Sequence, residues 1–111
     1  GGGGGAGGAG ENGNIRFGDS GGNGGAGGSS LISGSSQFYA AGGGGGNQNG
    51  IYNPQSRQNG IGGITNANAS TRATAGVANT GSGGGAATHT VNVNPAGADG
   101  ASGIVIIRYQ L

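Results

Sequence analysis

The sequence predicts a non-helical fold in which glycine-rich, polyglycine-II-type extended segments combine with short β-strands and a C-terminal β-strand closes the structure. Three observations predict this class. Glycine occupies 34 of the 111 positions, and many glycines recur in Gly-Gly-X triplets. The large apolar side chains are few and gather in the last residues, 104–111. No segment shows the 3.6-residue hydrophobic period of an amphipathic α-helix.

The length of the chain predicts a single glycine-rich domain over residues 1–111, either whole or the C-terminal part of a longer protein. A side-chain core cannot hold such a domain alone. Each fully buried apolar side chain contributes about 1.5–3 kcal/mol, whereas ordering the backbone costs about 1–2 kcal/mol per residue. We therefore expect backbone hydrogen bonds, association between subunits, or both to supply much of the stability.

The triplets lie at 4–10 and 21–29, with Ala, Asn or Ser in the third place. A period of three matches the polyproline-II helix, which has three residues per turn and no internal hydrogen bonds. Its N–H and C=O groups point sideways, so neighbouring helices can pair laterally where glycine permits close approach. The triplets thus predict packed polyglycine helices with the third residue facing outward. A flexible glycine-rich linker is the alternative.

The middle of the chain holds a short internal repeat, because Gln-Asn-Gly-Ile at 48–51 recurs at 58–61. Asn-Gly pairs favour tight turns with positive φ, and the isoleucine that follows can anchor the returning chain. We expect two similar turns that cap adjacent extended segments. Further on, residues 88–94 alternate between polar and apolar positions, which predicts a half-buried strand that Pro95 ends.

The last residues predict a second strand with two different faces. Val105, Ile107, Tyr109 and Leu111 share one face, whereas Ile104 and Ile106 give way to Arg108 and Gln110 on the other. We expect this strand to act as a structural clasp that is buried centrally or paired with another chain, so that its deletion gives unfolded or aggregated protein. The clasp residues are Ile104, Val105, Ile106, Ile107, Tyr109 and Leu111.

The sequence context of each apparent catalytic or cofactor motif argues against it, so we expect no enzyme, no cofactor and no catalytic or metal residue. The stretch GDSGG at 18–22 resembles the nucleophile loop of serine proteases, but His89, the sole histidine, lies downstream and the chain is too short. The GxGxxG match at 22–27 has no strand–helix unit around it. Glu11, Asp19 and Asp99 leave a Ca²⁺ site as an open alternative.

Charge and hydropathy exclude two classes of partner. The net charge of +1 supplies no basic footprint for nucleic acid. No apolar run approaches the roughly 18 residues of a membrane span, so we expect no membrane insertion. The expected partners are further copies of the chain, as a trimer or a filament, and a host-surface glycan or protein.

The stretch 101–109, Ala-Ser-Gly-Ile-Val-Ile-Ile-Arg-Tyr, resembles the closing motif of the glycine-rich domain at the end of many bacteriophage tail-fibre and related virion proteins. Ala101 stands where glycine is more usual in that motif. The resemblance implies a virion or extracellular component, commonly trimeric, for fibre assembly and host-surface attachment. Such a component would present variable loops to the host.

Two other functions fit parts of the sequence. A self-assembling extracellular filament or matrix protein without a receptor would need the same robust fold. An ice-binding protein is a minor alternative, because Thr88-x-Thr90 and the Gly-Gly-X triplets are similar to features of ice-binding proteins.

Any ligand is expected to meet the turn-rich segments between the glycine tracts. Aromatic, amide and guanidinium groups on loops combine contact area with hydrogen bonding, as recognition of a sugar or protein surface requires. The candidate ligand-binding residues are Phe38, Tyr39, Tyr52, Gln55 and Arg57.

Overall fold

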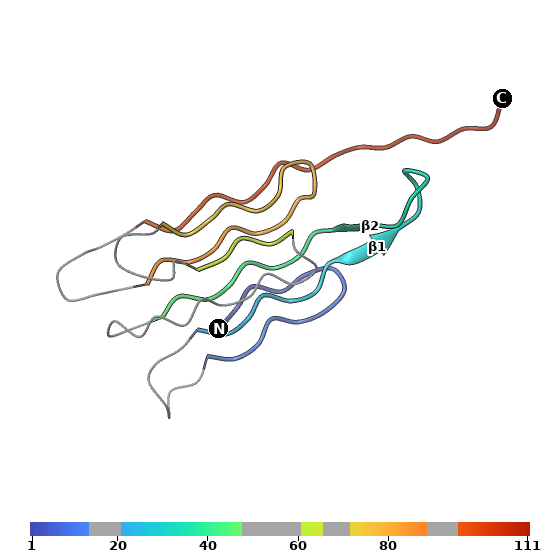
Figure 1. Cartoon of the computed structure of the whole chain (residues 1–111). Helices are drawn as coiled ribbons and strands as arrows, with labels where there is room; N and C mark the ends of the chain where they lie inside the picture. The colour runs from blue at the N-terminus through green and yellow to red at the C-terminus, as the bar shows by residue number, and fades with distance from the viewer. Residues whose placement is uncertain (14–20, 48–60, 66–71, 89–95) are drawn as a thin grey trace.

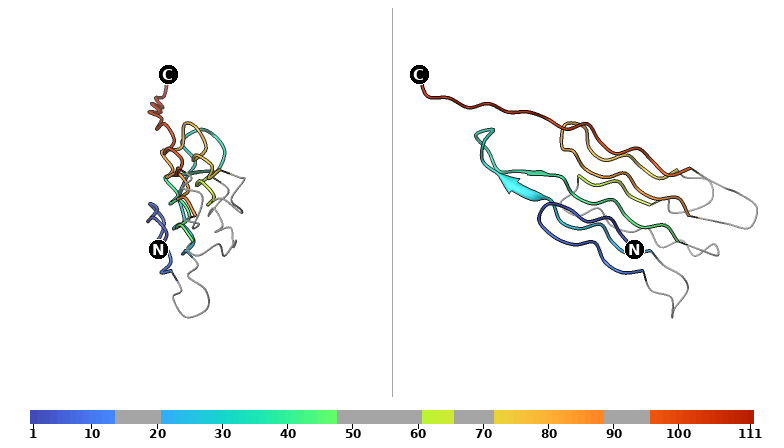
Figure 2. Two further views of the ribbon diagram at one scale, coloured as in Figure 1. Left: turned by 90° about the vertical axis from the view of Figure 1, so that its left-hand side faces the viewer. Right: turned by 180° about the vertical axis from the view of Figure 1, so that it is seen from behind.

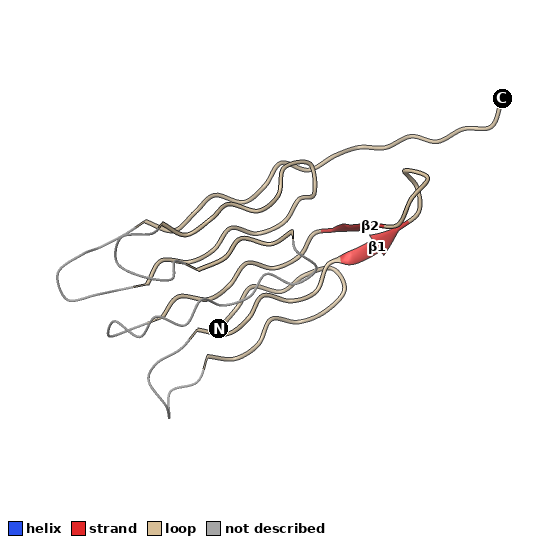
Figure 3. Cartoon of the chain, viewed as in Figure 1, coloured by secondary structure: helices blue, strands red, loops and turns tan. Residues whose placement is uncertain are grey.

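The computed structural model describes residues 1–13, 21–47, 61–65, 72–88 and 96–111. These residues contain no α-helix, and therefore no helix that is long and apolar enough to cross a membrane. Their only sheet pairs β1 (Gly28–Ser30) with β2 (Gln37–Tyr39) in antiparallel register, Ser29 opposite Phe38 (Figure 3). The predicted non-helical fold with short β-strands is therefore confirmed.

Extended segments run up and down beside one another and form what we call the lattice (Figure 1). Figure 2 shows that the lattice is thin when seen edge-on, and the principal extents of the molecule are 60 × 24 × 14 Å. The lattice segments are 1–5, 8–13, 21–28, 40–47, 61–65, 72–77, 82–88 and 96–103.

Burial along these segments repeats every three residues. In 21–27 the glycines are buried while Asn23 and Ala26, the third residues of the triplets, are only half-buried. In 82–88 the buried residues are Ser82, Gly85 and Thr88. A three-residue period is that of the polyproline-II helix, so the packed arrangement predicted for the triplets is present in 21–27.

The first triplet tract differs from the prediction of one continuous helix. Gly5 and Gly8 bond to each other across a tight turn, with 2.8 Å from the Gly5 N–H to the Gly8 carbonyl. The tract therefore folds back on itself, and Gly2 donates to the carbonyl of Glu11 at 2.9 Å. One glycine-rich stretch thus supplies two neighbouring lattice segments.

Segment 40–47 is the centre of the lattice. Its backbone forms hydrogen bonds of 2.7–3.1 Å with residues of 3–6, 22–25, 63 and 80–86. For example, Gly42 donates to Gly25 and Gly83 donates to Ala41, both at 2.9 Å. Residues 41–45 are all buried as a result. The interior of the protein is peptide backbone surrounded by peptide backbone.

Only glycine fits this spacing. A Cβ atom on Gly43 would overlap the carbonyl group of Gly84, and one on Gly24 would overlap the carbonyl group of Gly42. Because these neighbours are backbone atoms, no side-chain rotation relieves the overlap. Gly4 is different, since its Cβ would meet nothing within 4 Å.

The buried side chains in the described residues serve the backbone. Ala41 is the one buried apolar residue among them, and the others are Asn47, Thr65, Ser82 and Thr88. The Asn47 side-chain oxygen accepts from the Gly21 N–H at 2.7 Å, and the Thr65 hydroxyl donates to the Gly45 carbonyl at 2.7 Å. No buried side-chain N or O atom in this part of the chain is left without a partner. Polar side chains thus complete the lattice where a neighbouring segment ends.

The C-terminal residues correct one expectation. Residues 104–111, called the tail below, form no strand. They extend away from the lattice as a single segment (Figure 1). Ala101 donates to Ser82 and Ser102 accepts from Gly81, and these are the last lattice bonds. Beyond them, no backbone hydrogen bond joins the tail to the rest of the described chain. Of the two environments expected for the tail, burial within the chain is therefore not found, and pairing with another chain stays a prediction.

Two further expectations concern residues outside the described ranges. The repeated Asn-Gly turns lie at 49–50 and 59–60, and most of the expected strand 88–94 lies there too. Thr88, the first residue of that strand, is described and has no exposed surface. It therefore cannot belong to an exposed threonine face, which removes Thr88-x-Thr90 as support for ice binding.

We predict that Gly43→Ala destabilises the protein while Gly4→Ala does not. At Gly43 the added methyl group forces the central segments apart, which costs at least about 1–3 kcal/mol and lowers the midpoint of thermal unfolding by about 5 °C or more. Gly4 has open space and no positive φ, so the same change is neutral or slightly stabilising. Equal midpoints for the two variants, followed by circular dichroism, would contradict the lattice packing.

Candidate functional site

Large apolar side chains are exposed at one end of the lattice. We call it the hairpin end, and it comprises β1, β2, the turn 31–36 between them, the turn 78–81 and the root of the tail (Figure 1). The exposed large apolar residues of the described chain are Leu31, Ile32, Phe38, Val77, Ile104, Val105, Ile107, Tyr109 and Leu111. All of them lie at this end or on the tail.

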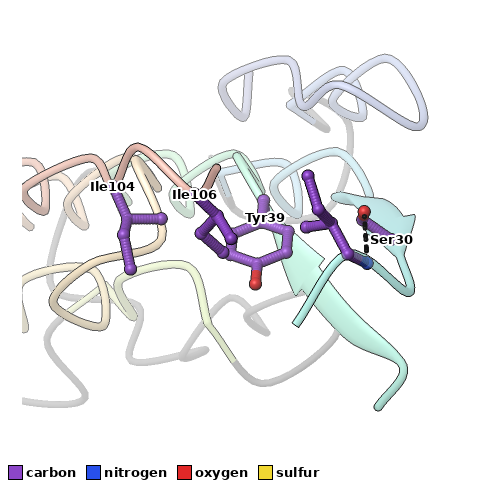
Figure 4. A pocket seen from close by; sticks show the side chains of 5 residues that line it. Ser30, Tyr39, Ile104 and Ile106 are labelled. Carbon is purple, nitrogen blue, oxygen red and sulfur yellow. Dashed lines mark hydrogen bonds between the residues drawn. The ribbon is translucent and has the colours of Figure 1, made fainter. Parts of the chain in front are cut away.

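A groove of about 170 Å³ lies between the hairpin and the root of the tail (Figure 4). Ser30 and Ile32 line it from the β1 side, Tyr39 from β2, and Ile104 and Ile106 from the tail. The Ser30 hydroxyl accepts a hydrogen bond from the Ile32 N–H at 3.3 Å, which shapes the start of the turn. The first residues of the tail therefore lie beside the hairpin and share a groove with it.

A wider depression of about 440 Å³ continues from this groove across the hairpin end. It adds Phe38, Ile61 and Val77, together with the polar residues Asn79 and Thr80. The groove and the depression thus form one surface, which we call the hairpin-end surface.

Two turns hold this surface in place. Gly34 has φ of 93°, a conformation that favours glycine, and its N–H donates to the Leu31 carbonyl at 2.9 Å to reverse the hairpin. In the second turn Gly81 has φ of 66° and donates to the Ser102 carbonyl at 2.8 Å. Asn79 donates from its backbone to the Ser102 hydroxyl at 3.0 Å. The root of the tail is fixed by these bonds.

The described side chains that line this surface are suited to contact with a partner. They are isoleucine, valine and aromatic side chains with hydroxyl and amide groups, and none of these described residues carries a carboxylate, an imidazole or a basic group. Proton transfer and metal binding need those groups. Elsewhere in the described residues no three metal-binding side chains come together, and Glu11 accepts from the Asn23 side chain at 2.7 Å.

The structure places the predicted ligand residues unequally. Phe38 and Tyr39 belong to β2 and line the hairpin-end surface. Tyr52, Gln55 and Arg57 lie outside the described residues. The described chain stops at Asn47, at the end away from the hairpin, and is next described at Ile61, beside the hairpin-end surface. Phe38 and Tyr39 are thus the predicted ligand residues for which a common surface is shown.

Sequence reasoning missed Ser30, Ile32 and Val77 as parts of this surface. The signal for the first two was present, because Ser-Leu-Ile and Gln-Phe-Tyr flank a Gly-containing turn at 33–36, which is a hairpin pattern. Nothing local indicated Val77, which reaches the surface through the hydrogen bond from its N–H to the Ile61 carbonyl at 2.8 Å.

The six clasp residues divide between two environments. Ile104 and Ile106 turn toward Tyr39 in the groove. Val105, Ile107, Tyr109 and Leu111 are 75–108% exposed. The tail is attached to the domain at its root by one face, and its other face is open.

We predict that deleting residues 104–111 leaves the lattice folded, in contrast to the expectation from sequence. The deletion removes only the groove contacts of Ile104 and Ile106, worth up to about 1.5–3 kcal/mol each, and no lattice hydrogen bond. Far-ultraviolet circular dichroism should keep its shape, with a cooperative thermal transition. A deletion from Ala98 onward is the control, because it removes the bonds of 98 and 101 to segment 82–88. An unfolded 104–111 deletion would restore the clasp hypothesis.

The comparisons with known proteins identify a family for the chain. No curated protein and no solved structure matches the chain. The profile of the glycine-rich domain family matches residues 1–110, which is nearly the whole sequence. The chain therefore belongs to the glycine-rich domain family.

Proposed function

We propose that this domain is a structural, non-enzymatic module of a virion tail fibre or adhesin that serves assembly and host-surface attachment. One observation supports the proposal most strongly. The lattice is built from backbone hydrogen bonds between glycine-rich segments, so nearly all large side chains are left for surfaces and connections. A scaffold of this kind holds exposed groups in place and performs no chemistry of its own.

The arrangement of the connections supports a presenting role. The described segments stop at residues 13, 65 and 88 and resume at 21, 72 and 96, and these ends lie on the side of the lattice away from the hairpin (Figure 1). The glycine contacts described above lie within the described segments and involve no residue between these ends. Rigid scaffolds with variable connections are the common basis of recognition surfaces. The likeness of 101–109 to the closing motif of tail-fibre proteins adds the virion or extracellular setting.

A self-assembling filament or matrix protein is the second candidate function. The exposed apolar tail favours it, because a filament needs surfaces that bind further subunits. Electron microscopy separates the two candidates, since a filament protein gives indefinite polymers and an attachment module gives discrete particles.

We predict that the purified domain binds bacterial cells or a glycan array saturably, and that Tyr52→Ala combined with Arg57→Ala weakens this binding at least about tenfold. Both residues lie outside the described residues and take part in no described lattice bond, so we expect the midpoint of thermal unfolding to stay the same. Phe38→Ala tests the hairpin-end surface in the same assay, and Gly4→Ala is the control. Indefinite polymers without any cell or glycan binding would overturn the attachment role in favour of the filament.

A further inference from the structure

The tail presents an apolar face that nothing in the described chain covers. Val105, Ile107, Tyr109 and Leu111, which we call the tail face, are exposed to 88%, 82%, 75% and 108%. A contiguous strip of four large apolar side chains is unusual on a protein that works as an isolated monomer.

The rest of the tail is accounted for. Ile104 and Ile106 point into the groove beside Tyr39. Arg108 and Gln110 follow them on the same side and are exposed to solvent, as charged and amide groups prefer. The tail face is therefore the side whose apolar side chains are most exposed, since Ile104 on the other side is 51% exposed and Ile106 is half-buried.

The backbone of the tail is also unpaired. Within the described residues, no hydrogen bond joins 103–111 to the rest of the chain. The root is nevertheless held, because Ser102 bonds to Gly81 and Asn79. A segment fixed at its root and extended beyond it loses little further freedom on binding, which favours association.

We propose that the tail face packs against the tail face of another copy of this chain. No side chain of the tail face is charged, and the one charged side chain of the tail, Arg108, alternates with the tail-face residues in sequence, so no charged side chains oppose each other where two tail faces meet. Side chains that alternate along an extended segment can interdigitate with an identical strip across about 10 Å, the spacing of facing sheets. Such self-complementary contact is the commonest way in which identical subunits associate.

The contact continues one that the chain already makes. The groove covers the Ile104 and Ile106 side of the tail, and a second copy would cover the opposite side. Together they enclose the apolar part of the tail and leave Arg108 and Gln110 in water. The inference rests on the assembly part of the proposed function and names its surface, while attachment through Tyr52 and Arg57 is tested separately.

The test is sedimentation equilibrium of the full chain with variants on the two sides of the tail. The wild type should associate to two or more copies. Val105→Asp with Ile107→Asp should raise the dissociation constant at least about a hundredfold, because two charges enter an apolar contact. Gln110→Asp places the same side chain on the outer face and should leave association within about threefold of wild type. Circular dichroism checks that the lattice is the same in all three proteins.

A second measurement uses the absence of cysteine from the chain. Ile107→Cys should form a covalent dimer efficiently with a short bismaleimide, whereas Ala9→Cys, exposed on the lattice, should not. A wild type that is monomeric at every concentration would overturn the proposal. Association that survives Val105→Asp with Ile107→Asp would overturn it too, as would equal cross-linking at positions 107 and 9. In each of these cases the attachment role would still stand on the cell-binding assay.

Discussion

The lateral hydrogen bond between two glycine-rich segments is the interaction on which the whole structure depends. A polyproline-II backbone makes no hydrogen bonds of its own, so every N–H in the interior must find a carbonyl on a neighbour. The neighbours around 40–47 supply those carbonyls at 2.7–3.1 Å, and they come close enough only because glycine occupies the facing positions. Stability in this protein is therefore a matter of backbone spacing rather than of side-chain volume.

That spacing also decides where the other residues go. Side chains that can finish a backbone hydrogen bond, such as Asn47 and Ser82, are admitted to the interior. Large apolar side chains are expelled to the hairpin end and the tail, where they form the hairpin-end surface and the tail face. Most proteins bury the majority of their large apolar side chains in a core and expose only a few. In the described part of this chain, most of the large apolar side chains that would form a core in another protein are exposed instead. The exposed apolar residues and the glycine lattice thus follow from one constraint, and the assembly that we propose uses those exposed residues.

The period of three was the part of the fold that sequence could predict, because the Gly-Gly-X pattern at 21–29 reports directly which residues face a neighbour. The order of the segments was not predictable, since identical backbone groups carry no information about their partners. For the tail, apolar content indicated burial within the chain or against another chain, and the exposure of its side chains in the single chain leaves the second of these as the prediction. The groove was missed because it joins Tyr39 to Ile104 and Ile106, which are far apart in sequence.

Amide hydrogen exchange tests the central claim most directly, since it reports on individual backbone hydrogen bonds. The N–H groups of Gly42 and Gly45 donate to segment 21–28 and that of Gly44 donates to segment 61–65, so their exchange should be slow and should speed up together on global unfolding. The tail amides of the monomeric Val105→Asp, Ile107→Asp variant provide the unprotected reference in the same experiment. Exchange of the three glycine amides as fast as that of the tail would contradict a lattice held together by backbone hydrogen bonds.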